Sequence, residues 1–378
     1  MYSIKVTFGR AVIIALLFLS SIRFPVFASD IQAMWVVRDY MTCPEYIDKA
    51  LEFAAENNFN HIFAQVRGRG DAYYKSDIVS RSDIVKSDFD PLDYILRQSK
   101  RFNIKVHAWI NVYYLWSASR MPTQDNHILK THPQWLDTKE FQYVNVKKML
   151  STMNRSRVPN GEGFFLAPTH PDVEKYLLNI ITEIVRKYPI DGLHFDYIRY
   201  HDFEYGFNPE GMKVFKGEYQ SLDQTTYSVI REKPSWGDFR RNRITRFIEK
   251  ASKIIRIYSS DIVISAAVKP NIYLARNRYG QEWDLWLSAG YIDWALPMNY
   301  AIKKDDFDLN LRVIQDNLPK KYHKKIIMGI STYNQSARSA GKKVLYARKL
   351  NFPNICVFSY STFQEKPVYW TLLKRYFK

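Results

Sequence analysis

A short apolar segment carries a carboxylate and an imidazole that could perform acid–base chemistry. It reads Asp191-Gly192-Leu193-His194-Phe195-Asp196-Tyr197-Ile198-Arg199-Tyr200. Side chains alternate between the two faces of a strand, so we expect His194, Asp196 and Ile198 on one face and Tyr197 on the other. Because an unpaired buried carboxylate is costly, Asp196 has either a chemical task or an ion pair, for which Arg199 is a candidate.

Two other segments present polar side chains that suit a sugar ligand. His107, Trp109 and Asn111 alternate with apolar residues, and such a stripe can hydrogen-bond and stack on a sugar but is awkward in a core. Arg67 and Asp71 follow a further apolar run, in a turn that lacks the third Gly of a phosphate-binding loop. The ends of other apolar runs supply Arg38, Asp39, Lys269, Asn299, Tyr300 and Tyr360.

The motifs of other catalytic classes are missing from the sequence. The chain has no Gly-x-Ser-x-Gly elbow, no His-Glu-x-x-His, no P-loop and no cysteine cluster. His107, His194 and Asp196 could hold a metal ion, as in metal-dependent barrel hydrolases, but a close His-x-His pair is missing. We therefore predict neither a metal nor another cofactor and keep the metal site as an alternative.

Eight apolar runs alternate with amphipathic stretches from residue 31 to the end of the chain. The predicted strands are 34–37, 61–66, 105–112, 192–198, 262–268, 294–298, 326–330 and 355–359. Residues 172–187 and 241–258 repeat apolar side chains at helical spacing. This alternation predicts a parallel sheet, and eight units predict closure into a (β/α)8 TIM barrel, with an open doubly wound sheet as the rival.

Two of the predicted strand-to-helix connections are long, residues 113–168 and 200–238. In a (β/α)8 barrel such loops form the C-terminal face, where sites are built, so we expect them to make the walls of a cleft. We interpret the prolines in these connections as loop residues; they are Pro122, Pro133, Pro159, Pro168, Pro209 and Pro234. No linker or repeat divides residues 29–378, which we interpret as one domain.

At these motifs the sequence resembles the glycosyl hydrolase-like 10 family of exported bacterial barrel proteins. The matching stretches are Gln65-Val66-Arg67, Gly70-Asp71-Ala72-Tyr73-Tyr74, Phe89-Asp90-Pro91-Leu92, Val106-His107-Ala108-Trp109-Ile110-Asn111, residues 191–200 and Pro297-Met298-Asn299-Tyr300. The resemblance implies a (β/α)8 barrel that acts on glycan chains, with peptide-free peptidoglycan as one known type of substrate. Many members have two adjacent Asp residues in the fourth-strand motif, whereas here Tyr197 takes the second place, which makes Asp196 the stronger candidate.

Glycoside hydrolysis usually needs two carboxyl groups, one as acid and one as nucleophile or base. We assign Asp196 as nucleophile or base and Asp71 as the first candidate for the acid, although two nearby arginines oppose the raised pKa that an acid needs. Asp39 and Glu365 are weaker candidates for the acid, and Asp202 and Glu204 could close over the substrate. The predicted substrate-binding residues are Arg67, His107, Trp109, Asn111, His194 and Tyr300.

The first 28 residues read as a secretory signal peptide. Lys5 and Arg10 precede an apolar run, and Val26 and Ala28 are small residues at the cleavage positions. The run is shorter than the about 20 apolar residues that a membrane span needs, although an uncleaved anchor remains an alternative. We therefore expect an exported protein, periplasmic or extracellular, cleaved after Ala28.

The chain carries a formal charge of +17 and two cysteines, Cys43 and Cys356. Such a charge suits polyanions, including peripheral association with an anionic cell envelope. The sequence contains no recognised nucleic-acid motif, so nucleic acid is not an expected partner. Two cysteines exclude a disulfide scaffold and leave a single bridge open, and the sequence does not indicate the oligomeric state.

The sequence as a whole predicts an exported glycoside hydrolase acting on a polysaccharide, either cell-wall glycan or exopolysaccharide. A glycan-binding protein that has lost catalysis is the alternative from another class, because the second carboxylate is not evident. A metal-dependent deacetylase or esterase is a third interpretation.

Overall fold

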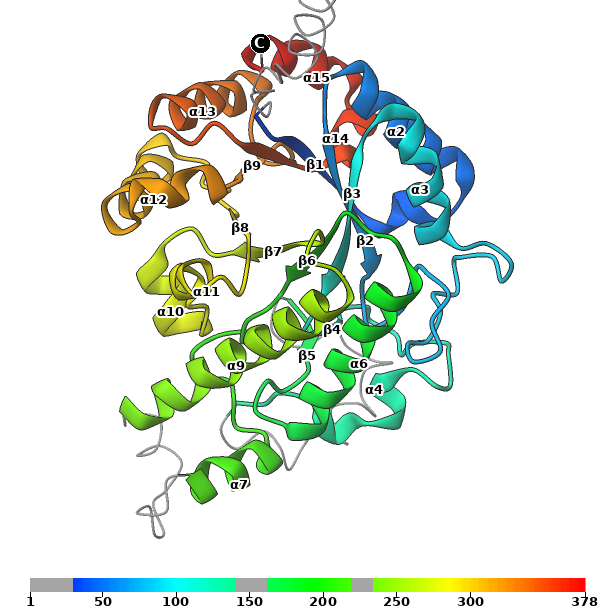
Figure 1. The fold of residues 1–378 in the computed structure, drawn as a ribbon, viewed down its shortest axis with the longest axis vertical. Coiled ribbons are helices and arrows are strands. Elements are labelled where there is room, and N and C mark those ends of the chain that lie inside the picture. Colours follow the sequence, from blue (N-terminus) through cyan, green and yellow to red (C-terminus); the bar gives the residue numbers. More distant parts are fainter. Residues whose placement is uncertain (1–29, 140–161, 219–233, 378) are drawn as a thin grey trace, which may run out of the picture. The chain divides into compact units, whose positions relative to one another are not determined.

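Eight parallel strands form one sheet in the computed structural model, which describes residues 30–139, 162–218 and 234–377 (Figure 1). Neighbouring strands follow the order β8-β7-β6-β3-β2-β1-β10-β9. Their bounds are β1 Gln32–Val36, β2 His61–Arg67, β3 Lys105–Asn111, β6 Gly192–Asp196, β7 Val263–Val268, β8 Trp294–Pro297, β9 Met328–Ser331 and β10 Ile355–Phe358. Each of the eight predicted strand segments overlaps one of these strands.

Parallel bridges between the two outermost strands bring the edges of the sheet together. Ala295 pairs with Ile326, and Met298 pairs with Gly329, so β8 and β9 are neighbours as well. Gly329 permits this approach, because a Cβ there would lie 2.8 Å from the Pro297 carbonyl oxygen. The predicted (β/α)8 barrel is therefore confirmed, and the open doubly wound sheet is wrong.

Helices lie outside the strands and alternate with them along the chain (Figure 1). The α-helices are α2 Pro44–Glu56, α3 Pro91–Ser99, α4 Ile128–Thr131, α6 Pro171–Lys187, α7 Pro209–Glu218, α9 Pro234–Tyr258, α10 Ile272–Tyr279, α11 Trp283–Ser288, α12 Lys304–Asn317, α13 Ala337–Lys349, α14 Tyr360–Glu365 and α15 Pro367–Leu373. Short 3-10 helices are η1 Arg38–Met41, η2 Lys100–Phe102, η3 Pro133–Trp135, η5 Lys320–Lys325 and η6 Lys374–Tyr376. Residues from Ile31 onward form one compact unit.

Helix α6 shows how local chemistry sets the bounds of these elements. Pro171 stands in the first turn, and the His170 side chain accepts a hydrogen bond from the Asp172 amide. Val173, Leu177 and Ile184 are buried along one face, because residues three or four apart share a side of a helix. The apolar period thus predicted this helix to within a residue.

Three of the prolines interpreted as loop residues instead begin helices. Pro133, Pro209 and Pro234 are the first residues of η3, α7 and α9. Proline suits the first helical position, because its missing N–H has no partner there and its φ is already helical. Helix α9 consequently starts seven residues before the predicted 241, and Trp236 and Phe239 in this extra segment pack with Phe215 of α7.

The long connection after β3 also contains regular structure. A two-stranded antiparallel sheet pairs β4 Tyr114–Trp116 with β5 Phe164–Phe165. Gly163 precedes β5 with a φ of +113°, and a side chain there would overlap the carbonyl oxygen of Trp116. This small sheet holds both ends of the third strand-to-helix connection at the C-terminal end of the barrel.

Strand β6 ends earlier than predicted, and the alternation of its side chains ends with it. Tyr197 has a φ of +51°, in the left-handed region that few residues other than glycine adopt. The backbone therefore turns after Asp196, and Ile198 joins the core cluster that also holds Leu193 and Phe195. The expectation that Ile198 shares the face of His194 and Asp196 is wrong for this reason.

Three further expectations concern the signal peptide, a membrane anchor and a disulfide bridge. The predicted signal peptide, residues 1–28, lies outside the described residues. Within the described part, no helix has the length and apolar character needed to cross a membrane. Cys43 and Cys356 are both free thiols, so the single bridge left open by the sequence is not formed.

Candidate active site

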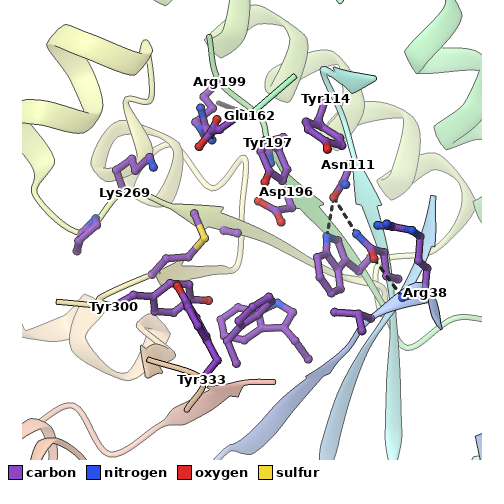
Figure 2. A pocket seen from close by; sticks show the side chains of 18 of the residues that line it. Arg38, Asn111, Tyr114, Glu162, Asp196, Tyr197, Arg199, Lys269, Tyr300 and Tyr333 are labelled. Carbon is purple, nitrogen blue, oxygen red and sulfur yellow. Dashed lines mark hydrogen bonds and ion pairs between the residues drawn. The ribbon is translucent and has the colours of Figure 1, made fainter. Parts of the chain in front are cut away.

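One cavity of about 590 Å³ opens where the barrel strands end (Figure 2). Its walls combine charged or amide side chains with aromatic rings. The charged and amide side chains are Arg38, Gln65, Asn111, Glu162, Asp196, Arg199, Lys269 and Asn310. The aromatic rings are those of Trp35, Trp109, Tyr114, Tyr197, Tyr300, Tyr333 and Phe358.

Asp196, the last residue of β6, lies in the middle of this cavity (Figure 2). Its side chain is 7% exposed, and Oδ1 accepts a hydrogen bond of 2.7 Å from the Tyr197 amide. Burial raises the pKa of the carboxyl to about 6, against the lowering effects of that amide, Arg199 and Lys269. A carboxyl with such a pKa can carry a proton near neutral pH, which is what a general acid requires.

Glu162, just before β5, is a second carboxyl in the cavity, and sequence reasoning missed it. Its Oε2 accepts from Arg199 Nη2 at 2.8 Å, so Arg199 pairs with Glu162 and not with Asp196. Burial by itself raises the pKa of Glu162, but Arg199, with smaller contributions from Lys269 and His201, outweighs burial, and the pKa lies below its usual value. The cavity therefore holds one carboxyl that favours its proton and one that favours its charge.

Three of the predicted substrate-binding residues line the cavity. Trp109 Nε1 donates to Asn111 Oδ1 at 3.0 Å, and Asn111 Nδ2 donates to the Gly68 carbonyl oxygen at 2.9 Å. These bonds hold the indole and the amide in place before any ligand arrives. Tyr300 stands across the cavity, with its ring 6.5 Å from Trp35 and 6.3 Å from Tyr333.

Asp71 and Arg67 lie outside this cavity lining. The Asp71 side chain accepts the Arg69 amide at 2.7 Å and so closes the turn after β2. Arg67 is fully buried and donates to the carbonyl oxygens of Asn111 and Val112, where the register between β2 and β3 shifts. Backbone groups of the barrel hold each side chain, so a structural role accounts for the presence of both residues.

His107 and His194 are also absent from the cavity lining and fill the interior of the barrel. His194 Nε2 accepts from Trp35 Nε1 at 3.2 Å, and its Nδ1 lies 2.9 Å from Ser265 Oγ. His107 Nε2 lies 2.9 Å from His61 Nδ1. Burial lowers the pKa of His194 to about 3 and that of His107 well below its usual value, so both rings are neutral.

The weaker acidic candidates are likewise placed away from the cavity lining. Asp202 pairs with Arg278 through both carboxylate oxygens at 2.7 Å, and Glu204 pairs with Lys139 at 2.5 Å. Asp39 and Glu365 are exposed on η1 and α14. Within the described residues, no group of three His, Cys, Asp or Glu side chains is arranged to hold a metal ion.

Comparison with solved structures places the barrel among glycoside hydrolase folds. The glycoside hydrolase domain of PgaB (BpsB) from Bordetella bronchiseptica superposes with a TM-score of 0.70 at 15% identity and covers 91% of this chain and 98% of that one. The catalytic domain of β-amylase from Paenibacillus polymyxa gives 0.60 at 11% identity, covering 92% and 98%. At these identities the likeness shows the fold alone.

Curated relatives match the chain over a little more than half its length. Glycosyl hydrolase DigH from Escherichia coli K12 is 28% identical over 218 residues, which are 56% of this chain and 44% of that protein. Glycosyl hydrolase YngK from Bacillus subtilis 168 is 21% identical over 221 residues, covering 56% and 37%. The match spans less than half of either relative. The family model described as glycosyl hydrolase-like 10 matches residues 26–343, so the chain belongs to the glycosyl hydrolase-like 10 family.

Proposed function

We propose that this protein is a glycoside hydrolase that cleaves a polysaccharide in the cavity at the barrel mouth, with Asp196 as its general acid. The observation that carries the proposal is the pKa of Asp196, raised to about 6 by burial at the centre of an open, sugar-sized cavity. This environment suits the acid, whereas the sequence assigned Asp196 the part of nucleophile or base. Glu162 replaces Asp71 as our candidate for the second carboxyl.

The two carboxyls divide the reaction between them. Asp196 donates its proton to the glycosidic oxygen while the bond from that oxygen to the anomeric carbon breaks. Glu162, ionised beside Arg199, either attacks the anomeric carbon or takes a proton from the water that does so. Asp196 must then be protonated and Glu162 charged in the same pH range, and their opposite pKa shifts provide this.

The aromatic rings supply the matching binding surface. Trp109, Tyr300 and Tyr333 face the cavity from separate strand ends, and flat rings stack on the apolar faces of sugars. Family membership and glycoside hydrolase relatives support a glycan substrate. We therefore propose cell-wall glycan or exopolysaccharide as the polymer, without a cofactor.

We also propose that the protein acts outside the cytoplasm. Residues 1–28 have the charged start, apolar run and small residues of a cleavable signal. Removing them removes Lys5, Arg10 and Arg23 and no acid, which leaves a formal charge of +14 from the original +17. Amino-terminal sequencing of protein recovered from the periplasm or medium should start at Ser29, and an intact Met1 would contradict this.

One observation favours a second candidate, a glycan-binding protein without catalysis. The ion pair with Arg199 engages Oε2 of Glu162 and so makes this carboxylate a weaker nucleophile and a weaker base while the pair holds. If the pair persists with substrate bound, the cavity binds glycan and leaves it intact.

Release of new reducing ends decides between the two. Wild type, Asp196→Asn and Glu162→Gln would each be incubated with peptide-free peptidoglycan strands, intact sacculi and an acidic exopolysaccharide. We expect cleavage by wild type and a loss of about 10²–10⁴-fold in either variant. Asp71→Asn is the matched control, because asparagine can still accept the Arg69 amide, and it should keep full activity.

The reverse pattern would overturn the assignment. A fully active Asp196→Asn variant would remove the acid from our mechanism, and an inactive, folded Asp71→Asn variant would restore the assignment made from sequence. Binding without release by wild type on every polymer would establish the glycan-binding alternative.

A further inference from the structure

The charges that line the cavity do not balance. Among the described lining residues, Arg38, Arg199 and Lys269 are cations, and Glu162 and Asp196 are the acids. Arg199 is neutralised by Glu162, and the raised pKa of Asp196 keeps part of its population uncharged near pH 6. With Asp196 ionised the lining has one cation in excess, and with Asp196 protonated Arg38 and Lys269 are both in excess, so a ligand that entered the cavity would meet a positive field.

Within the described residues, Lys269 is held in position without a direct ion pair, although the charges of Glu162 and Asp196 act on it from across the cavity. It follows β7 directly, and its backbone is fixed by Gln281, which accepts from its amide at 2.9 Å, and by Trp283, which donates to its carbonyl oxygen at 3.1 Å. Its ammonium lies 4.8 Å from the centre of the Tyr279 ring, and no ion pair within 4.0 Å is found for it in the described part of the chain. Burial and the neighbouring Arg199 lower the pKa of this ammonium to about 8, so Lys269 is still mainly charged at neutral pH, and the Tyr279 ring supports the cation.

Arg38 occupies the corresponding place after β1. Its amide donates to Gln65 Oε1 at 3.1 Å, and its side chain crosses Gly68, where a Cβ would stand 2.6 Å from Arg38 Cδ. Asp71 lies beside the same glycine, but its Oδ1 accepts the Arg69 amide. No ion pair of Arg38 within 4.0 Å is found among residues 30–139, 162–218 and 234–377.

The two cations face each other across Asp196. Around the barrel, β1 and β7 are separated by three strands in either direction, so they stand on opposite walls. Figure 2 shows Lys269 and Arg38 on either side of the cavity with Asp196 between them. A polysaccharide cleaved beside Asp196 would thus lie near one cation on each side of the broken glycosidic bond.

We propose that this cavity selects an acidic polysaccharide, with Lys269 and Arg38 binding carboxylates of sugars on opposite sides of the cleaved bond. The inference rests on the proposed function, because it takes Asp196 as the point of cleavage. A neutral glycan would leave two partly buried cations without counter-charge, whereas a carboxylate gains a charge-assisted hydrogen bond from each. Lys269 and Arg38 are then specificity-determining residues.

Binding measurements test the selectivity apart from catalysis. Asp196→Asn protein, which should not cut its ligand, would be titrated calorimetrically with polyglucuronate oligosaccharides and peptide-free peptidoglycan strands. The same two ligands with their carboxyls reduced to alcohols, and chitin oligosaccharides, are the neutral probes. We expect at least one acidic probe to bind about tenfold or more tightly than its reduced form, with the difference shrinking at high salt.

Substitutions then assign the selectivity to the two residues. In the same background, Lys269→Met and Arg38→Gln should each lower affinity for the acidic probe by about tenfold and leave neutral probes unchanged. Lys269→Arg should retain the preference. Lys100→Met removes an exposed charge near the start of β3, far from the cavity lining, and should alter neither affinity.

Each remaining outcome has a definite meaning. Equal binding of acidic and reduced probes by the parent protein overturns the selectivity, and so does an equal loss for both probe types in Lys269→Met. If that variant does not fold, Lys269→Gln and Arg38→Gln carry the test. Acid-selective binding without reducing-end release by wild type would instead defeat the hydrolase proposal. The preference for acidic glycans would then stand, but the placement of the two cations on either side of a cleaved bond would fall with the hydrolase.

Discussion

The interior of the barrel holds polar side chains at two depths, an upper level at the mouth and the lower levels beneath it. The two depths differ in the partners that surround these side chains. Register fixes the levels, because His107 pairs with Gly192, Trp109 with His194 and Asn111 with Asp196 along neighbouring strands. At the lower levels the two histidines are neutral and bonded to residues of the barrel. At the top, Asp196 lines an open cavity.

The comparison teaches that position along a strand, more than residue type, separates structural from chemical polar groups. A histidine two residues below the mouth has its ring nitrogens engaged and its charge suppressed by burial. A carboxyl at the mouth is buried enough to raise its pKa and open enough to receive a ligand. Perturbed pKa values therefore identify a candidate site only together with access.

The pH dependence of activity tests this contrast most sharply, because Asp196 at the mouth should titrate near neutrality and the histidines below it should not. If protonated Asp196 is the acid, kcat/KM should fall about tenfold per pH unit above about 6. The histidines do not contribute, since their pKa values lie well below that range, at about 4 for His61 and about 3 for His194. A pH–rate profile that stays flat from about pH 6 to about pH 8 would contradict the acid role.

The same shift has a consequence for stability with a definite sign. Folded Asp196 binds its proton more tightly than the unfolded chain does, so its contribution to the free energy of unfolding falls as pH rises from about 4 to about 6. Asp196→Asn removes the cost of a buried charge and should raise that free energy by about 1–3 kcal/mol at neutral pH, but not near pH 4. Urea unfolding at both pH values would measure this.

The lower level should respond to packing and leave the chemistry intact. A side chain at Gly192 would overlap the imidazole of His107, so Gly192→Ala should lower the free energy of unfolding by about 1–3 kcal/mol. Activity per folded molecule should stay near that of wild type. Gly217→Ala is the matched control, because no atom of the described residues lies within 4 Å of its added Cβ, and its stability should not fall.

The outcome of that pair measures how tightly the interior is packed. If Gly192→Ala unfolds at the same urea concentration as wild type, His107 has room to move and the lower level is looser than its contacts indicate. If the variant stays folded but loses activity, the two levels are coupled and the contrast between them fails.

Much of the fold could be predicted from sequence, because the apolar runs that make barrel strands are local signals. The site was predictable only where it continues those strands. Trp109, Asn111 and Asp196 were found because strand ends meet at the barrel mouth. His107 and His194 carry the same residue types at lower levels, and their depth depends on a register that the sequence does not reveal.

The placement of Asp71 outside the cavity lining, and the omission of Glu162 from the predicted site, have a different physical origin. A carboxylate that accepts a backbone amide in a turn looks, in sequence, the same as one that serves a substrate. Glu162 stands in a long connection without apolar periodicity, and its place depends on a hairpin that pairs residues far apart in sequence. Its one local signal is the glycine that follows, whose φ of +113° marks a special backbone position.

The smallest expected effect concerns the rim of the mouth, beyond both levels. Tyr333 is 56% exposed, and its ring lies edge-on to the rings of Tyr300 and Phe358, with 6.3 and 6.0 Å between ring centres, so much of this side chain is open to a ligand. Tyr333→Ala should raise KM by about three- to tenfold with little change in kcat, because stacking far from the broken bond binds ground state and transition state alike. Tyr333→Phe should behave as wild type. A fall in kcat without a change in KM would instead place Tyr333 with the groups around Asp196 that act in the transition state. The catalytic part of the mouth would then reach beyond the buried carboxyls and include residues of the βα loops.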